Sequence, residues 1–248
     1  TVGTDFDYLA DGESTTVSFN YTASDNSPTP GISTTKTVTI TINGEEDPTT
    51  TSDDEDTAIE DGSIVYGSLP VQDLDLNDTF TYFIDQNPSE GSVSWQSSSA
   101  GIYAYDSGSD FQDLVYGAER IVSFTYYTQN QFGDQSNTST VTITVTGTND
   151  NPIAENHTDS TFENLNILDG QIPPATDIDS TDLEGEVINE VNPNGYSLVS
   201  PTSPLNCNNG AADCGTLNFN NDGSYTFTVG TDFDYLADGE STTVSFNY

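Results

Sequence analysis

Two short segments carry the same spacing of aspartates, and carboxylates in such a pattern can bind a cation. The pattern Asp-x-Asp-x-x-Asp occurs at 73–78 and again at 177–182. On an extended segment, alternating side chains project to one side. A hard cation such as Ca²⁺ takes about six to eight oxygens from carboxylates and backbone carbonyls. The two segments therefore predict Ca²⁺ binding.

Each aspartate segment follows another acidic or polar stretch, which we call a joint. The first joint, 44–48, reads Gly-Glu-Glu-Asp-Pro, and the second joint, 147–152, reads Gly-Thr-Asn-Asp-Asn-Pro. Carboxylates about 5 Å apart repel by several kcal/mol at low effective dielectric unless a cation lies between them. The alternative is a solvated charge run, or the acidic surface of a salt-adapted protein. The pattern makes the following residues candidate ligands: Glu46, Asp47, Glu60, Asp73, Asp75, Asp78 and Asp182.

The charge balance excludes several classes of function. The 248 residues include 41 acidic and 2 basic side chains, for a formal net charge of −39. Nucleic acids and anionic membranes are excluded as partners because binding either needs basic patches. Direct membrane insertion is not expected, since no run approaches the roughly 18 apolar residues of a membrane span. With 1 histidine, no Ser-His-Asp or Cys-His set can be assembled, so we expect no enzyme.

The elements that must position these carboxylates come in repeats. Residues 1–21 recur without change at 228–248, a period of 227 residues. A weaker repeat relates 5–44 to 110–147. Reading the repeats before the fold predicts three parts: the C-terminal half of one domain at 1–46, a complete domain at 47–148, and the N-terminal part of a further domain, of the same type as 1–46, at 149–248.

The local pattern is that of strands. Val38, Ile40 and Ile42 alternate with threonines, as do Val141 and Ile143, and a period of two is typical of a strand. Turn residues interrupt the runs at hairpin-like spacing, at Asp11-Gly12, Gly133-Asp134, Asn194-Gly195 and Asp222-Gly223. About seven short strands in about 100 residues predict an all-β fold of immunoglobulin-like β-sandwiches. We expect aromatic side chains to supply most of the core.

The segment 140–152, Thr-Val-Thr-Ile-Thr-Val-Thr-Gly-Thr-Asn-Asp-Asn-Pro, together with Asp-Phe-x-x-Leu and the aspartate pattern, resembles the cadherin-like and VCBS-type repeats of bacterial RTX (repeats-in-toxin) adhesins. The resemblance implies tandem cadherin-like β-sandwiches in a linear array, stiffened by Ca²⁺ at the linkers. It also implies further ligands at the second joint: Asn149, Asp150, Asn151, Glu163, Asp177 and Asp179. The first joint departs from the family pattern, with Gly-Glu-Glu-Asp where Gly-Thr-Asn-Asp is usual.

The two cysteines, Cys207 and Cys214, enclose six residues in an otherwise cysteine-free chain. An exported context favours a local disulfide between them. A metal site there lacks partners, because His157 is the sole histidine.

Together these features predict a structural extender repeat of a large extracellular, cell-surface adhesin, with Ca²⁺ as its cofactor and neighbouring repeats of the same chain as its partners. A glycan or surface partner would bind through other regions of the full protein. Two alternatives stay open: the repeat unit of a self-assembling extracellular filament, and a carbohydrate-binding module that would use Trp95, the only tryptophan.

Overall fold

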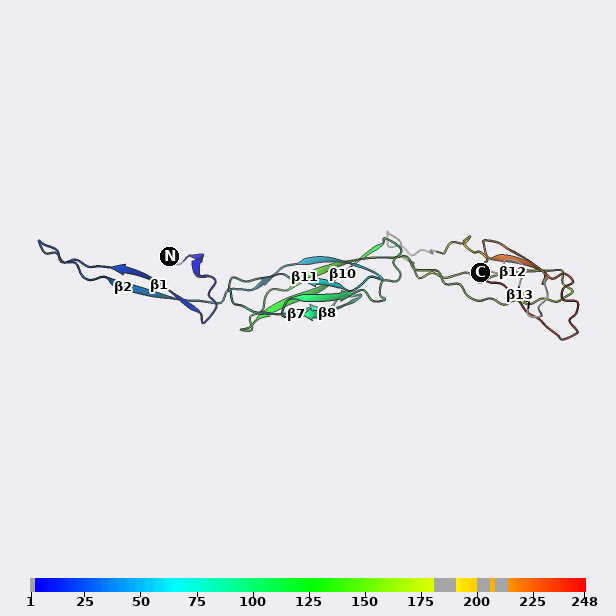
Figure 1. The fold of residues 1–248 in the computed structure, drawn as a ribbon, viewed down its shortest axis with the longest axis horizontal. Coiled ribbons are helices and arrows are strands. Elements are labelled where there is room, and N and C mark those ends of the chain that lie inside the picture. The colour runs from blue at the N-terminus through cyan, green and yellow to red at the C-terminus, as the bar shows by residue number, and fades with distance from the viewer. Residues whose placement is uncertain (1–2, 181–190, 200–205, 208–213) are drawn as a thin grey trace. The chain divides into compact units, whose positions relative to one another are not determined.

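The computed structural model describes residues 3–180, 191–199, 206–207 and 214–248. The chain divides into two compact units: Thr1–Phe111 with Glu119–Thr148, and Gln112–Ala118 with Asn149–Tyr248. Strands make up almost all of the regular structure, and among the described residues the one helix is the short 3₁₀ turn η1 (Thr4–Phe6) (Figure 1). None of the described residues belongs to a helix long and apolar enough to cross a membrane.

The first unit contains two sheets that face each other. One has four strands in the order β4-β11-β10-β7, and the other has three in the order β5-β9-β8. Strands β4 and β11 run parallel, and the other pairs are antiparallel. The bounds are β4 Asp54–Ile59, β5 Val65–Ser68, β7 Phe80–Gln86, β8 Ser92–Ser97, β9 Ile102–Asp106, β10 Glu119–Asn130 and β11 Ser139–Thr146. This four-on-three arrangement is an immunoglobulin-type sandwich, so the predicted all-β fold class is confirmed.

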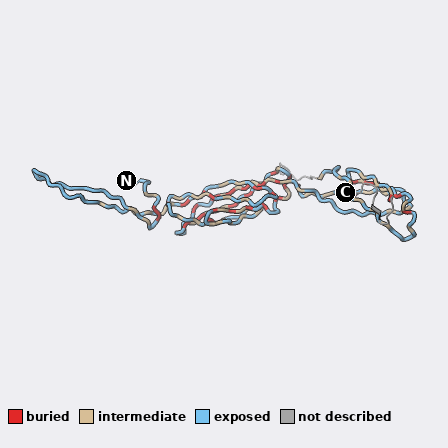
Figure 2. Tube along the Cα trace, viewed as in Figure 1, coloured by how far each residue is buried: buried red, intermediate tan, exposed pale blue. Residues whose placement is uncertain are grey.

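Aromatic side chains join the two sheets, as the composition predicted. The ring of Tyr103 on β9 meets that of Phe124 on β10 edge-on, with centroids 5.1 Å apart. Tyr82 on β7 meets Trp95 on β8 at 6.1 Å. Tyr103 and Phe124 are fully buried, and Figure 2 shows buried residues interspersed with intermediate and exposed ones in the sandwich. Such ring pairs bury large areas in preferred geometries.

One glycine makes room for this core. A Cβ added at Gly67 on β5 would collide with the Tyr103 ring. The tyrosine therefore lies directly over the glycine of the neighbouring strand, and its hydroxyl donates to Asp56 Oδ2 over 3.1 Å. A position where an aromatic ring covers the backbone tolerates no side chain.

Both basic residues of the chain lie in strands. Arg120, near the start of β10, donates to Glu90 Oε1 over 2.9 Å and lies 5.9 Å from the centre of the Phe111 ring. Lys36 is the first residue of β2 (Lys36–Asn43). Both cations of the chain therefore belong to paired strands.

Strands β1 (Ser14–Tyr21) and β2 form an antiparallel hairpin with eight residue pairs in register. The strand predicted from the alternation of apolar residues with threonines in this segment is confirmed. Both strands are mostly exposed (Figure 2). Next along the chain, the two-residue strand β3 (Thr50–Thr51) pairs with β6 (Val71–Gln72). That pairing brings the first joint beside the aspartate segment that follows β6.

The second unit contains the three-stranded sheet β12-β15-β14 and the two-stranded sheet β13-β16. A buried cluster of Cys214, Val229 and Phe233 packs beside them, with Phe227 and Val244 at its edge. The bounds are β12 Ile167–Gln171, β13 Asn206–Cys207, β14 Thr216–Phe219, β15 Ser224–Thr228 and β16 Val244–Ser245.

Candidate metal site

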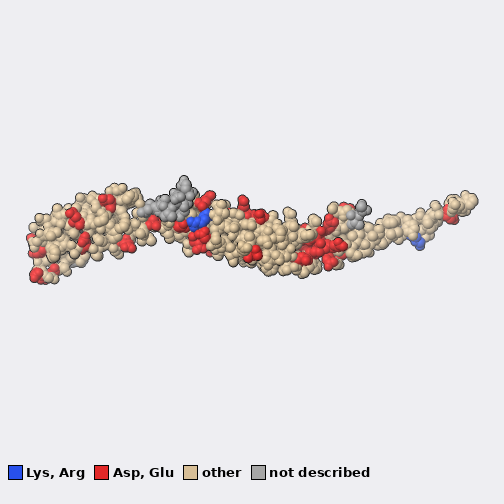
Figure 3. Space-filling view, turned by 180° about the vertical axis from the view of Figure 1, so that it is seen from behind, with Lys and Arg blue, Asp and Glu red and all other residues tan. Residues whose placement is uncertain are grey.

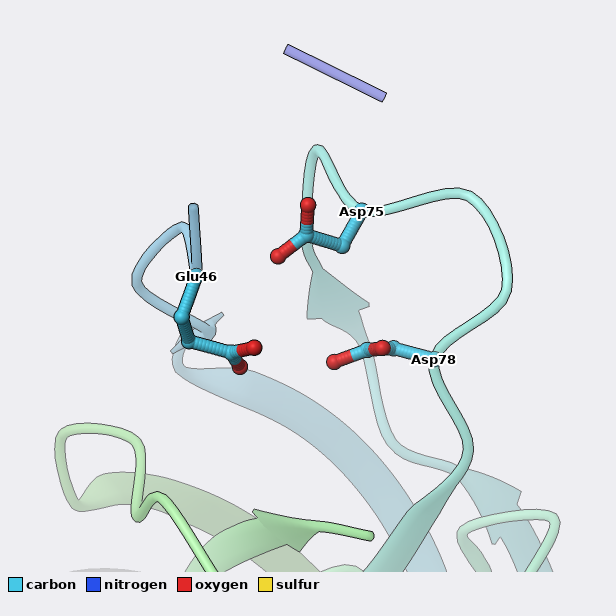
Figure 4. Close-up of side chains that lie close together, drawn as sticks. All are labelled: Glu46, Asp75 and Asp78. Atoms are coloured by element: carbon cyan, nitrogen blue, oxygen red, sulfur yellow. The ribbon is translucent and has the colours of Figure 1, made fainter. Parts of the chain in front are cut away.

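Three carboxylates converge beside the first joint in the first unit. One oxygen each of Glu46, Asp75 and Asp78 can be chosen so that all three lie within 4.8 Å of one another. Figure 4 shows the three side chains pointing toward a common space from two loops. We call these residues the acidic cluster. On the face seen in Figure 3, Asp and Glu side chains gather in separate groups, and few basic side chains lie among them.

Backbone hydrogen bonds fix the loop that carries Asp75. The N–H of Asp75 donates to Asp73 Oδ1 over 3.0 Å, and the hydroxyl of Thr49 donates to Asp73 Oδ2 over 2.5 Å. The N–H of Asp47 donates to Asp75 Oδ2 over 2.9 Å. The aspartate segment is thereby tied to Asp47 of the first joint and to Thr49, just after the joint.

These bonds correct one expectation from the sequence. Residues 73–79 do not form an extended segment with aspartates aligned on one side, because β6 ends at Gln72 and the chain then bends. The Asp73 carboxylate turns back to accept from the backbone of Asp75, as Asp side chains commonly do in turns. Asp78, not Asp73, completes the acidic cluster.

Two oxygens of the acidic cluster are buried without a hydrogen-bond donor. They are Glu46 Oε2 and Asp75 Oδ1. The Asp75 residue is only 4% exposed, so its carboxylate has lost nearly all contact with water. A buried acceptor without a donor is costly and needs an explanation. A cation bound by these oxygens would supply one.

Asn130, the last residue of β10, and Gln131, just after it, donate hydrogen bonds to the carboxylates of Glu46 and Asp78. The amide Nδ2 of Asn130 donates to Glu46 Oε1 and, over 3.2 Å, to Asp78 Oδ2. The amide of Gln131 donates to Asp78 Oδ1 over 2.6 Å. Asn130 Oδ1 accepts from the N–H groups of Phe132 and Asp134 at 3.0 and 2.9 Å. Sequence reasoning missed Asn130 and Gln131, because amides at a strand end give no signal in charge or spacing.

The electrostatics of the cluster disfavour three negative charges without a counterion. Burial raises the pKa of Glu46, and the nearby Asp78 and Asp75 carboxylates raise it further. Burial also raises the pKa of Asp75, against the opposing hydrogen bond from Asp47. Two ionised carboxylates about 5 Å apart repel by about 3 kcal/mol at an effective dielectric of about 20.

The donor set fits Ca²⁺ better than a transition metal. All three side chains offer hard carboxylate oxygens, and the described residues of the cluster include no histidine or cysteine. Carboxylate oxygens with backbone carbonyls and water suit Ca²⁺, whereas nitrogen and sulfur ligands select zinc or copper.

The second joint repeats the backbone geometry of the first, within the second unit. The N–H of Asp179 donates to Asp177 Oδ1 over 3.1 Å, and the N–H of Asp150 donates to Asp179 Oδ2 over 2.8 Å. Asp179 is 2% exposed. The same pattern of residues therefore folds in the same way in both joints.

The remaining candidate ligands lie in varied surroundings. Glu163 has a buried Oε2 without a donor, while Asn149 donates to Asp150 O over 2.6 Å and Asn151 is exposed. Glu60 is 1% exposed, follows the far end of β4 and accepts from the N–H of Thr148 over 2.8 Å. It is not part of the acidic cluster. Asp182 lies outside the described residues.

The other predicted sites can be placed in part. Cys214 is buried and Cys207 lies in β13. The disulfide between them stays a prediction. His157 is exposed. Trp95 packs against Tyr82 and is half-buried, so it lies against the core of the sandwich.

Comparison with known proteins gives matches among solved structures alone. No family model matches the chain, and no curated protein matches it. The extracellular cadherin domains 1–4 of protocadherin gamma B7 share 14% identity, covering 93% of this chain and 56% of theirs, with a TM-score of 0.39. Drosophila N-cadherin domains EC1–4 share 13%, covering 94% and 57%, with a TM-score of 0.33.

A glycoside hydrolase family 107 endo-fucoidan hydrolase shares 13% identity, covering 92% of this chain and 33% of its own, with a TM-score of 0.31. The chain thus spans between a third and three-fifths of the length of these three structures. All three TM-scores lie below 0.5, so function has to be argued from the residues of this chain.

Proposed function

We propose that this chain is a structural extender repeat of a large extracellular, cell-surface adhesin, stiffened by Ca²⁺ at its joints and contributing to cell adhesion or biofilm attachment. Its partners are neighbouring repeats of the same protein. The observation that carries the proposal is the acidic cluster, where Asp75 is buried and one of its carboxylate oxygens has no donor.

The proposed stiffening of the joints is electrostatic in origin. Glu46, Asp75 and Asp78 would hold a divalent cation, which would offset their mutual repulsion and link the first joint to the loop after β6. The joint would then have fewer conformations, because both segments would be ligated at once. The repeated geometry at Asp150 and Asp179 supports the same role at the second joint. The −39 net charge makes such counterions necessary throughout an array of these domains.

The domain organisation is part of this proposal. We place a complete sandwich at 47–148, the C-terminal half of another domain at 1–46, and the N-terminal part of a domain of that second type at 149–248. The family resemblance to RTX-type adhesins is consistent with such repeats. A disulfide between Cys207 and Cys214 would close a short loop in the larger domain type, beside the buried cluster that contains Cys214.

Calcium titration of matched variants tests the metal site. Isothermal titration calorimetry on the wild type should detect Ca²⁺ binding, and the thermal midpoint should rise with Ca²⁺ because the ion binds the folded state. Glu46→Gln should weaken binding at the first joint by at least tenfold. Glu55→Gln is the matched control, since Glu55 is exposed on β4 of the same sandwich.

Small-angle X-ray scattering tests the stiffening separately from the binding. The profile should change when chelator removes Ca²⁺, because joints without the ion sample more orientations. Equal thermal midpoints in Ca²⁺ and in chelator would contradict the metal site. A profile that is the same in both conditions would contradict the stiffening, even if the ion binds.

A further inference from the structure

The first and last strands of the four-stranded sheet pair with each other in parallel. Six residues of β4 pair in register with six of β11, from Asp54 opposite Val141 to Ile59 opposite Thr146. The other strand pairs of the sandwich are antiparallel. Because β4 and β11 run in the same direction, the N-terminal end of β4 and the C-terminal end of β11 lie at opposite ends of the pair. The chain therefore enters this pair at one end and leaves it at the other.

An asparagine side chain ties the residues before β4 to the residues before β11. Asn137 Oδ1 accepts from the N–H of Thr51 over 2.9 Å, and Asn137 Nδ2 donates to Thr51 O over 3.0 Å. The Thr51 hydroxyl donates to Asn137 O over 2.8 Å and lies 2.9 Å from Ser139 Oγ. Thr51 and Ser139 are buried. The Asn137 amide thus bonds both backbone groups of Thr51, as a neighbouring strand would.

The next two residues along the chain are also bonded to neighbouring strands. Ser52 O accepts from the hydroxyl of Tyr126 on β10 over 2.8 Å. Asp53 Oδ1 accepts from the N–H of Thr140 on β11 over 2.7 Å. Three consecutive residues before β4 are therefore held in place, each by a different partner.

The far end of the pair is closed by a glutamate. The N–H of Glu60 donates to Thr146 O over 3.0 Å, and the N–H of Thr148 donates to Glu60 Oε2 over 2.8 Å. The bonds between the two segments thus continue beyond the paired strands at both ends. We call the β4–β11 pair together with these bonds the strand lock; its segments are 51–60 and 137–148.

Tension along the chain would load the strand lock in shear. Pulling residues 48 and 148 apart draws β4 towards its N-terminal end and β11 towards its C-terminal end, so the two strands must slide past each other. Sliding breaks the bonds of all six residue pairs together. An antiparallel hairpin pulled at its open end instead separates one pair after another. Resistance to forced unfolding depends on the unfolding rate, and a step that breaks many bonds at once is slow.

We propose that the strand lock is the element of this sandwich that resists tension, and that Asn137 and Thr51 set the rate at which it opens under load. The presence of tension rests on the proposed function, because an extender repeat transmits the pull between a cell and the surface to which it adheres. The lock itself rests on the hydrogen bonds described above. It contains no residue of the acidic cluster.

Single-molecule force spectroscopy on the 248-residue chain tests this role. One handle is attached to the N-terminus and the other to the exposed position 157, through His157→p-azidophenylalanine. The sandwich is then the longest segment under tension, and its unfolding step is identified by length, since an extended chain gains up to about 3.5 Å per residue. At constant force, Asn137→Ala and Thr51→Val should each raise the unfolding rate of this step at least tenfold.

Tyr82→Phe is the matched control. Like Thr51→Val, it removes one hydroxyl from a buried hydrogen bond, in this case from Tyr82 to Leu69 O over 3.2 Å. It leaves β4 and β11 unchanged, so under tension its unfolding rate should stay within threefold of wild type. Unfolding in denaturant without tension measures how each variant changes stability alone. An effect of the lock is the additional acceleration under tension.

Changing the direction of pulling tests the lock without any variant of its residues. The second handle is moved to the exposed Phe132, in the turn between β10 and β11, as Phe132→p-azidophenylalanine. Both strands are then pulled from their N-terminal ends, which lie at the same end of the pair, so they peel apart pair by pair. At the same force, the sandwich should unfold at least a hundredfold faster than with the handle at 157. This comparison decides the question even if Asn137→Ala does not fold.

Equal unfolding rates in the two pulling directions would overturn the proposal. It would also be overturned if Asn137→Ala and Thr51→Val accelerate unfolding under tension no more than Tyr82→Phe does. The ratio of variant to wild-type rates should be the same in Ca²⁺ and in chelator, and a ratio that falls to one in chelator would assign the effect to the metal site instead. A chain that binds no Ca²⁺ but keeps these ratios would contradict the metal-site proposal alone.

Discussion

The N–H of Asp47 donates to a carboxylate oxygen of Asp75, and this bond ties the first joint to the loop after β6. The other oxygen of that carboxylate is buried and has no donor. The Asp75 carboxylate thus makes one structural hydrogen bond and leaves its other buried oxygen without a donor. Separating these two roles gives the sharpest test of the site.

Asp75→Asn should have opposite effects with and without Ca²⁺. The asparagine keeps an oxygen to accept from Asp47 but removes a buried charge, so in chelator the thermal midpoint should rise. In Ca²⁺ the ion loses a charged ligand, and its affinity should fall at least tenfold, about 1.4 kcal/mol. Differential scanning calorimetry in Ca²⁺ and in chelator measures both changes in the thermal midpoint. An unchanged calcium-induced shift would exclude Asp75 as a ligand.

Asn130→Asp should act in the reverse direction. It removes the amide that donates to Glu46 and Asp78 and adds a fourth carboxylate beside them. The midpoint in chelator should therefore fall, and the increase produced by Ca²⁺ should be larger than in wild type. The retained Oδ1 can still accept from Phe132 and Asp134, which limits the change to the electrostatics. A calcium-induced increase no larger than in wild type would contradict this role.

Stability should fall steeply at alkaline pH. Burial raises the pKa of Tyr105 and Tyr126 to about 12, and that of Tyr103 further. Tyrosines in the unfolded chain release their protons near pH 10, while these buried ones keep theirs. Their contribution to stability is therefore complete below about pH 10 and is lost between about pH 10 and 12. Tyrosinate absorbance and circular dichroism should change together in that range.

Tyr126→Phe serves as the control for the alkaline transition. It removes one late-titrating hydroxyl and its hydrogen bonds to Ser52 O and Pro70 O. The amplitude of the late absorbance change should drop by one tyrosine. Full titration of all tyrosines before the loss of circular dichroism would contradict the prediction.

Gly67→Ala and Gly170→Ala should each lower the free energy of unfolding by roughly 1–3 kcal/mol, the usual cost of overpacking a core. The added Cβ collides with Tyr103 in one case and with Tyr225 in the other. Gly3→Ala is the control, because a Cβ there meets nothing within 4 Å. Chemical denaturation measures all three. A free energy of unfolding that Gly67→Ala leaves almost unchanged would mean that the Tyr103 ring can move aside.

Much of the fold could be predicted from local pattern. Strict alternation in β2 and β11 marks both strands, and the turns at Gly12, Gly133 and Gly223 are confirmed by their positive φ angles. These features depend on near neighbours in the chain. The internal repeat aligns β1 with β10.

The candidate site was predictable only in outline. Spacing singled out the aspartates, yet it could not show that Asp73 turns inward to bind the backbone while Asp78 joins Glu46. Asn130 and Gln131 come from more than 50 residues away in sequence. Side-chain direction and distant partners are set by tertiary packing, which no short motif encodes.

The scarcity of basic side chains also bears on proteolysis. Trypsin-like enzymes cleave after Lys and Arg, so the whole chain offers them two bonds, after Lys36 and after Arg120. Both bonds lie in paired strands, and the Arg120 guanidinium is engaged by Glu90. Such an enzyme can cut only where β2 or β10 detaches from its neighbour, which makes limited digestion a direct gauge of how often each strand opens.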